Sequence, residues 1–239
     1  MYVEKPEAAL QFAIALKKRS ALVSLAEVVI APPYTLLPQL HAAFAHTKNV
    51  RLGAQAVSTH ADGAHTGEIS GGMLKALGVS VVIIGHSERR LSGETEELVR
   101  GQIVVAHKNK MSVVLCVGER ERDQQGTHFG IIETQITEAL KDAPTGKLLI
   151  AYEPVWAIGK SALDAMKPAD LQEMVIFIRK VLTDKLGRPV AAKVPILYGG
   201  SVEGANAKEL LHTGGVSGFL IGHASVEAHS FLEILTAVK

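Results

Sequence analysis

The sequence has very little cysteine and no long apolar run, and both absences limit the classes of protein to which the chain can belong. A single cysteine, Cys116, excludes an intrachain disulfide and fits a reducing compartment. Because it lies within an apolar run at 113–117, we expect a buried thiol rather than a nucleophile. No segment approaches the roughly 18 apolar residues of a membrane span, and the amino terminus lacks a signal-peptide pattern. We therefore expect no membrane partner and a cytoplasmic location.

The chain also lacks a clustered charge of either sign. Its formal net charge is +1, with acidic and basic residues interspersed. The basic face that nucleic-acid binding requires is absent, so no nucleic-acid partner is expected. The ten histidines are scattered, and pairs such as His41/His46 and His60/His65 lack the helical spacing of metal ligands. We predict no metal site.

The apolar residues that are present fall into short runs separated by amphipathic stretches. They make up 47% of 239 residues, enough for a sizeable core, and we expect one domain over residues 1–239. Little alternation within the runs is typical of strands buried on both faces, and repeated strand–helix alternation predicts a parallel α/β sheet. The predicted strands are 28–31, 51–57, 79–85, 112–117, 147–153, 194–198 and 218–221. The predicted helices are 6–19, 34–45, 95–108, 131–140, 168–186, 205–212 and 225–238.

Polar residues of unusual kind gather where these predicted strands end. His86 follows the third run, Glu153 ends the fifth, Gly-Gly-Ser at 199–201 follows the sixth, and Gly222 with His223 follows the seventh. Each has an ordinary structural explanation: a capped strand, a satisfied turn histidine or a tight turn. Together they share the rim of the sheet where strand-to-helix loops build active sites, and glycine-rich turns there bind anions. A carboxylate base, an imidazole and a phosphate pocket indicate proton transfer on a small phosphorylated substrate.

The apolar segment after Glu153 strengthens this interpretation. Val-Trp-Ala-Ile at 155–158 is too hydrophobic for an ordinary solvated loop and is closed by Gly159. A carboxylate under an apolar lid is an arrangement that excludes water from a reacting group. The alternative is a buried turn with no catalytic role.

Three segments resemble the signatures of the triosephosphate isomerase family. They are Ile-Gly-His-Ser-Glu-Arg-Arg at 84–90, Ala-Tyr-Glu-Pro-Val-Trp-Ala-Ile-Gly at 151–159 and Tyr-Gly-Gly-Ser-Val at 198–202. The resemblance runs from about Pro6 to the carboxyl terminus and implies a TIM (β/α)8-type barrel. It also implies interconversion of dihydroxyacetone phosphate and glyceraldehyde 3-phosphate without a cofactor.

The resemblance assigns roles residue by residue. Glu153 is implied as the base, and His86 as the electrophile, a neutral imidazole in the worked case that this family provides. Glu88 resembles a buried carboxylate beside the catalytic centre. The implied substrate phosphate-binding residues are Gly159, Ser201, Gly222 and His223, the last in place of a usual glycine. A loop around Thr66 resembles the family's dimer-forming element, so we expect a homo-oligomer, a dimer or larger.

The largest departure from the family is at the amino terminus. The chain opens with a helix, and the residues before it are too few for a full strand, so the barrel is expected to lack most or all of its first strand. That strand carries a lysine in the family, and no lysine here matches it. Residues 1–3 as a partial strand, a partner subunit or local disorder would compensate. The lid also departs from the family after Gly159. We predict weak isomerase activity; the alternative is a catalytically impaired phosphate-ligand-binding protein on the same fold.

Overall fold

The computed structural model describes residues 5–159 and 165–239. Seven parallel strands form one sheet whose spatial order is the chain order, from β1 to β7. The strands are β1 (Val28–Ile30), β2 (Val50–Ala54), β3 (Val79–Ile84), β4 (Ser112–Val117), β5 (Leu148–Tyr152), β6 (Ile196–Tyr198) and β7 (Gly218–Phe219). All seven predicted strands are confirmed. The bounds of β4 are as predicted, β2 begins one residue earlier and ends three residues earlier than predicted, and the other five strands are shorter.

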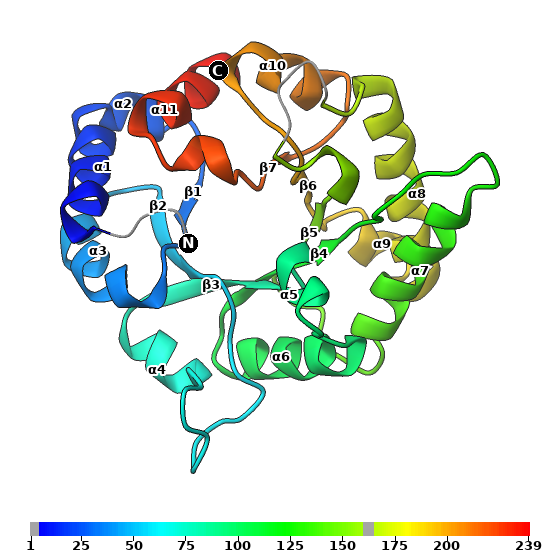
Figure 1. Cartoon of the computed structure of the whole chain (residues 1–239), viewed down its shortest axis with the longest axis horizontal. Coiled ribbons are helices and arrows are strands. Elements are labelled where there is room, and N and C mark those ends of the chain that lie inside the picture. Colours follow the sequence, from blue (N-terminus) through cyan, green and yellow to red (C-terminus); the bar gives the residue numbers. More distant parts are fainter. Residues whose placement is uncertain (1–4, 160–164) are drawn as a thin grey trace.

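Helices surround the strands, which curl about a common axis (Figure 1). They are α1 (Pro6–Lys18), α2 (Ser20–Val23), α3 (Leu37–Phe44), α4 (Gly71–Ala76), α5 (Ser87–Leu91), α6 (Glu96–Lys108), α7 (Thr127–Ala139), α8 (Pro168–Leu186), α9 (Arg188–Ala191), α10 (Gly204–His212) and α11 (Ala228–Ala237). Short 3₁₀ turns are η1 (Tyr34–Leu36), η2 (Val155–Ala157) and η4 (His223–Ser225). Each predicted helix is present, and the short helices α2, α4, α5 and α9 were not predicted.

The start of α7 corrects the predicted boundary. The helix begins at Thr127, four residues before the predicted start, and continues through Gly130. Gly126 precedes it in the left-handed conformation (φ 76°), and the Asp123 carboxylate accepts a hydrogen bond from the Thr127 N–H at 3.0 Å. The capping carboxylate offsets the helix-weakening effect of Gly130.

The core has two layers of unequal size. The larger layer lies between the strands and the outer helices. Every strand except β7 contributes buried residues to it. The smaller layer fills the inside of the barrel and consists of Val81, Val114, Cys116 and Ala151, with partly buried neighbours that include Leu220. Cys116 is fully buried, which confirms the predicted core thiol.

The barrel is incomplete between β1 and β7. Among the described residues each of these strands pairs on one side alone, β1 with β2 and β7 with β6. Over the described residues the fold is therefore a (β/α)8-type barrel that lacks its first strand, as the sequence predicted. Residues 1–3, which were suggested to form part of a strand, lie outside the described residues.

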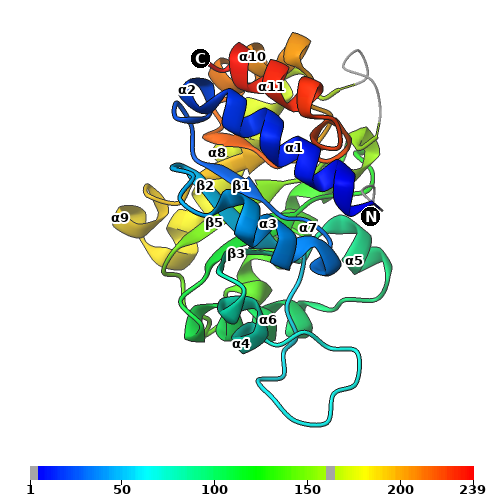
Figure 2. The same ribbon diagram turned by 90° about the vertical axis from the view of Figure 1, so that its left-hand side faces the viewer.

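Helices α1 and α11 cover this gap from outside. The rings of Phe12 and Phe231 meet there, with centroids 5.6 Å apart. Helix α1 begins on the side of the molecule where α5 lies and runs back toward the other end of the strands (Figure 2). Within the described parts of the chain, no helix is long and apolar enough to cross a membrane.

Candidate active site

The residues predicted at the strand ends do line one cavity. Its volume is about 2440 Å³, and it extends from the rim of the sheet down the gap between β1 and β7. The predicted residues that line it are His86, Glu88, Glu153, Gly159, Ser201, Gly222 and His223. The parallel topology explains this convergence, because the carboxyl ends of all seven strands meet at the same rim.

Glu153 and His86 lie in direct contact at this rim. Glu153 follows β5 and is 2% exposed, and its Oε1 lies 3.0 Å from the Nε2 of His86. Its other oxygen, Oε2, accepts a hydrogen bond from the Ser87 N–H at 2.9 Å. The carboxylate is therefore held by two donors from the start of α5, 66 residues away in sequence.

The tautomer of His86 follows from its second contact. Its Nδ1 accepts a hydrogen bond from the Glu88 N–H at 3.3 Å, so Nδ1 carries a lone pair. The proton of a neutral ring then sits on Nε2, which points at Glu153. The backbone of α5 thereby orients the imidazole as a donor toward the cavity.

Burial shifts the pKa of the Glu153 carboxyl group. Loss of solvent raises the pKa of this carboxyl, and the nearby His86 and the Ser87 N–H offset part of that rise. Burial, together with the neighbouring Glu153 charge, also raises the pKa of the Cys116 thiol well above its usual range. Cys116 therefore stays a neutral thiol beneath the carboxylate.

The apolar segment after Glu153 folds over the rim, as predicted. It forms the turn η2, and Ala157 is fully buried. The Ser201 hydroxyl donates to the Ala157 carbonyl at 2.9 Å and so joins the turn after β6 to the lid. Gly159 adopts a left-handed conformation (φ 72°) that favours glycine. The predicted departure after Gly159 begins in residues outside the described range.

Gly222 and His223 lie in the turn after β7. Gly222 immediately precedes η4, and its carbonyl accepts a hydrogen bond from the Ser225 hydroxyl at 2.7 Å. His223 is the first residue of η4 and is exposed at the cavity. The structure thus brings this turn to the same cavity as the glycine-rich turn after β6.

One predicted feature is wrong. Glu88 was expected to be a buried carboxylate, but it is exposed in the first turn of α5. The reason is that α5 faces the cavity mouth, and no described segment covers that part of the rim. Glu88 reaches His86 through its backbone N–H.

Sequence reasoning missed a second buried carboxylate at the rim, Glu119. Its Oε1 accepts hydrogen bonds from the Tyr152 hydroxyl at 2.8 Å, from Trp156 Nε1 at 2.9 Å and from Arg122 Nε at 3.0 Å. The Arg122 guanidinium also lies over the Trp156 ring, 5.6 Å from its centroid. The signal was available, because Glu119 lies two residues after the fourth apolar run, near the same rim as Glu153 at the end of the fifth. This cluster anchors the first part of the lid.

Comparison with known proteins decides the family. The family model described as triosephosphate isomerase matches residues 1–238. The chain belongs to the triosephosphate isomerase family. Within it, a triosephosphate isomerase of Flavobacterium johnsoniae is 42% identical over 220 residues, covering 89% of this chain and 86% of that protein. One from Magnetococcus marinus is 43% identical over 217 residues, covering 87% of this chain and 84% of that protein.

The described residues hold no group of three or more His, Cys, Asp or Glu side chains placed to bind a metal ion. The rings of His60 and His65 instead stack face to face, with centroids 3.6 Å apart. Their nitrogen atoms therefore do not converge on a point between them.

Proposed function

We propose that this chain interconverts dihydroxyacetone phosphate and glyceraldehyde 3-phosphate, with Glu153 as the base. The contact between Glu153 and His86 carries the proposal. A carboxylate that is 2% exposed and has a raised pKa accepts a proton from a carbon acid more readily than a solvated one. When substrate enters, Glu153 exchanges its contacts with Ser87 and His86 for the substrate C–H and moves the proton between the two adjacent carbons.

His86 acts on the oxygen atoms of the same substrate. Its Nε2–H is oriented by the Glu88 N–H that binds Nδ1. Released from Glu153, that N–H donates to the substrate carbonyl and stabilises the negative charge that develops on the oxygen. The hydroxyl proton then moves between the two substrate oxygens through the same nitrogen. Exposed Glu88 contributes through its backbone and lies beside the reacting groups.

The substrate phosphate binds at the opposite wall of the rim. We assign it to the backbone N–H groups of Gly159, Ser201, Gly222 and His223, since turns of this kind present donors to anions. The bond from Ser201 to Ala157 supports a lid that closes when the phosphate is in place. Closure excludes water and protects the enediolate formed after proton removal.

The described residues that line the cavity include no lysine at its rim, so we expect weak isomerase activity from these residues. Lys147 and Lys193 do line the cavity, but both precede strands and so lie at its far end. Loss of one preorganised electrostatic group lowers a catalysed rate by about 10²–10³.

The experiment is a coupled dehydrogenase assay on the chain and on Glu153→Gln. The residual rate should fall by about 10²–10⁴, the usual contribution of a general base, while Glu121→Gln, which alters an exposed carboxylate, leaves it unchanged. Extension of the amino terminus by a strand carrying Asn-Trp-Lys should raise the rate. A rate equal in the parent and Glu153→Gln would refute Glu153 as the base.

A second candidate, a phosphate-ligand-binding protein without turnover, is favoured by the open barrel. Titration with a phosphorylated enediolate analogue separates the two. Tight binding with no measurable turnover, even after the extension, would favour the binding protein. Tight binding with turnover abolished by Glu153→Gln would favour the isomerase.

We also propose that the chain self-associates through the loop between β2 and α4. This loop projects from the body of the molecule (Figure 2), and Thr66 is exposed on it. A projecting loop of this length is suited to insertion into a second subunit. The expected partner is a second copy of the chain.

A further inference from the structure

The two ends of the barrel carry opposite charge. In the described chain, the segments that lead from an outer helix into the next strand contain more basic than acidic residues, and the segments that leave the strands contain more acidic ones. We call the end where the strands begin the base. We propose that the base docks on the surface of an anionic lipid bilayer. The proposal is independent of the isomerase assignment, because it concerns binding at the end opposite Glu153.

Basic residues form a group at the base. Those in the segments that enter the strands are Arg19, Lys48, Lys110, Lys141, Lys147, Arg188 and Lys193, against the acidic Glu27 and Asp142, and all of them are exposed. The balance is reversed at the rim, where the described segments that leave the strands contain Asp62, Glu68, Glu119, Glu121, Asp123, Glu153, Glu203 and Glu227 against Arg120, Arg122 and Lys167. The barrel is therefore polarised along its axis.

This separation of charge is not visible in the sequence. Because the strands are parallel, the helices that join them begin at the rim and end at the base, so acidic and basic residues alternate along the chain. Helix dipoles favour this placement, since cations stabilise the carboxyl ends of helices. The expectation that charge is not clustered is therefore correct for the sequence and wrong for the folded surface.

Three of the lysines at the base precede neighbouring strands. Lys110, Lys147 and Lys193 lie before β4, β5 and β6, which are adjacent in the sheet. Lys110 and Lys147 adopt the left-handed conformation, at φ 61° and 58°, which is uncommon for residues other than glycine. The Lys147 ammonium donates to the Lys110 carbonyl at 3.4 Å, so these two residues are in contact. Positive charge is therefore concentrated on one arc of the base.

The charges of these lysines lack acidic partners within the described chain. No ion pair there involves Lys110, Lys147 or Lys193, and Glu27, at the same end, is paired with Arg51. Like charges that lie close together raise the free energy of the folded chain. A surface of anionic headgroups lowers that free energy, and each lysine that reaches the surface adds to the attraction.

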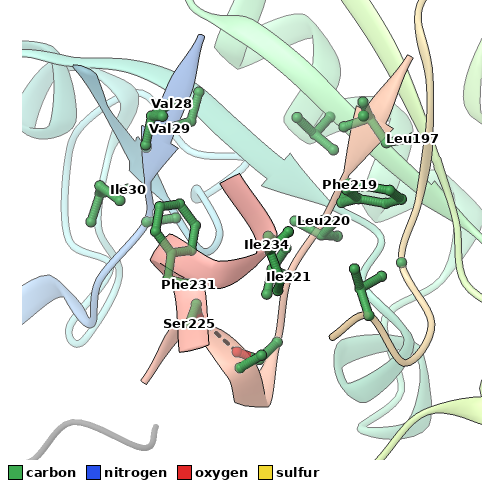
Figure 3. A pocket seen from close by; sticks show the side chains of 18 of the residues that line it. Val28, Val29, Ile30, Leu197, Phe219, Leu220, Ile221, Ser225, Phe231 and Ile234 are labelled. Carbon is green, nitrogen blue, oxygen red and sulfur yellow. Dashed lines mark hydrogen bonds between the residues drawn. The ribbon is translucent and has the colours of Figure 1, made fainter. Parts of the chain in front are cut away.

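Two exposed apolar side chains lie at the same end. Leu25, between α2 and β1, is 59% exposed, and Val190 in α9 is 42% exposed. Helices α2 and α9 lie at the end of the molecule opposite α5 (Figure 2). Both residues also line the cavity whose apolar interior Figure 3 shows. Apolar side chains among lysines suit the boundary between headgroups and acyl chains, where peripheral proteins bury apolar surface.

A lipid surface fits the base better than a nucleic acid does. The described segments that enter the strands contain no phenylalanine, tyrosine or tryptophan, so they offer no platform on which bases could stack. Docking through the base leaves the rim and Glu153 open to substrate. The prediction of no membrane partner rested on the lack of a membrane span, which a peripheral contact does not need.

The test measures cosedimentation of the full chain with lipid vesicles. One set contains phosphatidylcholine alone, and the other contains about 30% phosphatidylserine as the anionic lipid. Binding to the anionic set should be saturable at about 0.05 M NaCl and lost at about 0.5 M, because salt screens surface charge. Binding to the neutral set should be at least tenfold weaker. Equal binding to the two sets would overturn the proposal.

Two triple variants separate the position of the charges from the net charge. The first combines Lys110→Gln, Lys147→Gln and Lys193→Gln and should bind anionic vesicles about 100-fold more weakly. The control combines Lys167→Gln, Lys180→Gln and Lys208→Gln, which change the net charge equally at exposed sites away from the base. It should bind within about threefold of the parent. Circular dichroism should be unchanged in both, and an equal loss of binding in the two variants would refute the base as the docking surface.

A fluorescent label reports the orientation on the vesicle. Cys116 is fully buried, so a thiol-reactive dye attaches to a cysteine introduced at an exposed site. An environment-sensitive dye on Ala192→Cys, just after α9, should shift to the blue on anionic vesicles. The same dye on Glu121→Cys, at the rim, should not shift. A shift at the rim alone would contradict docking through the base.

Two other occupants of the base are outcomes of the same experiments. Tighter binding to duplex DNA than to anionic vesicles, at equal phosphate concentration, would assign the base to nucleic acid. If the chain binds no vesicles and light scattering shows oligomers that the Lys110, Lys147 and Lys193 variant dissociates, the base meets the acidic rim of a second copy. Either result would show that the proposal is wrong.

Discussion

Gly199 packs directly against the side chain of Glu153. A Cβ added at Gly199 would stand 2.8 Å from the Cγ of Glu153 and 3.4 Å from the Tyr152 carbonyl oxygen. The glycine N–H also donates to that carbonyl at 2.8 Å, which fixes the turn to the end of β5. Because Gly199 has no side chain, the turn after β6 packs closely against Glu153 and holds the candidate base in position.

Gly199→Ala should displace Glu153 and lower kcat by about 10²-fold, the usual effect of an ångström-scale misplacement of a reacting group. Gly130→Ala is the matched control, because its added Cβ meets nothing within 4 Å. It lies within α7 and should stabilise the fold by about 0.5–1 kcal/mol without altering kcat. Steady-state kinetics of both variants check this, and an unchanged kcat in Gly199→Ala would contradict the packing argument.

The raised pKa of Glu153 predicts a pH effect on stability. Burial disfavours the charged form, so the folded-state pKa exceeds the unfolded one. The contribution of this group to stability is then complete below the unfolded pKa and is lost as pH rises through the folded pKa. Glu153→Gln, which stays neutral, should melt at a higher temperature than the parent near pH 8 and at the same temperature near pH 4.

The same raised pKa predicts the acid limb of activity. The base works only when deprotonated, so kcat/KM should fall at a higher pH than an exposed glutamate would set. Thermal melts of the two proteins across pH and a pH–rate profile of the parent are the measurements. A melting difference that is constant with pH would show that Glu153 does not titrate as burial requires.

Glu119 should be a determinant of stability. Its removal leaves the buried Tyr152 hydroxyl, Trp156 Nε1 and Arg122 without their common acceptor. Glu119→Ala is expected to lower the free energy of unfolding by about 3–5 kcal/mol, as for other buried charges that lose a partner. Glu121→Ala, at an exposed neighbour, should change it by less than about 0.5 kcal/mol. Urea unfolding followed by Trp156 fluorescence distinguishes them.

The projecting loop should control oligomeric state. Thr66→Arg adds a charge that would be costly to bury between subunits, so it should shift the chain toward monomers. Thr213→Arg, at an exposed site beyond α10, is the control and should leave the state unchanged. Size-exclusion chromatography with light scattering measures both. A Thr66→Arg variant as large as the parent would place the interface elsewhere.

The sequence alone determined the strands, most helices and the rim on which the site lies. These features depend on local periodicity and on short motifs such as the segment 151–159, so nearby residues suffice to specify them. Even there, the first turn of α7 was missed, because the predicted start was Ile131 and the contact by which Asp123 caps Thr127 leaves no mark in the periodicity.

Only the tertiary structure decided which groups meet. The contacts of Glu153 with His86 and Ser87, the exposure of Glu88 and the cluster around Glu119 depend on how far the sheet curls and on the register between strands. No local pattern encodes those distances, since they join residues tens of positions apart. The gap between β1 and β7 among the described residues is of the same kind, because the packing of α1 against α11 over it could not be read from the sequence.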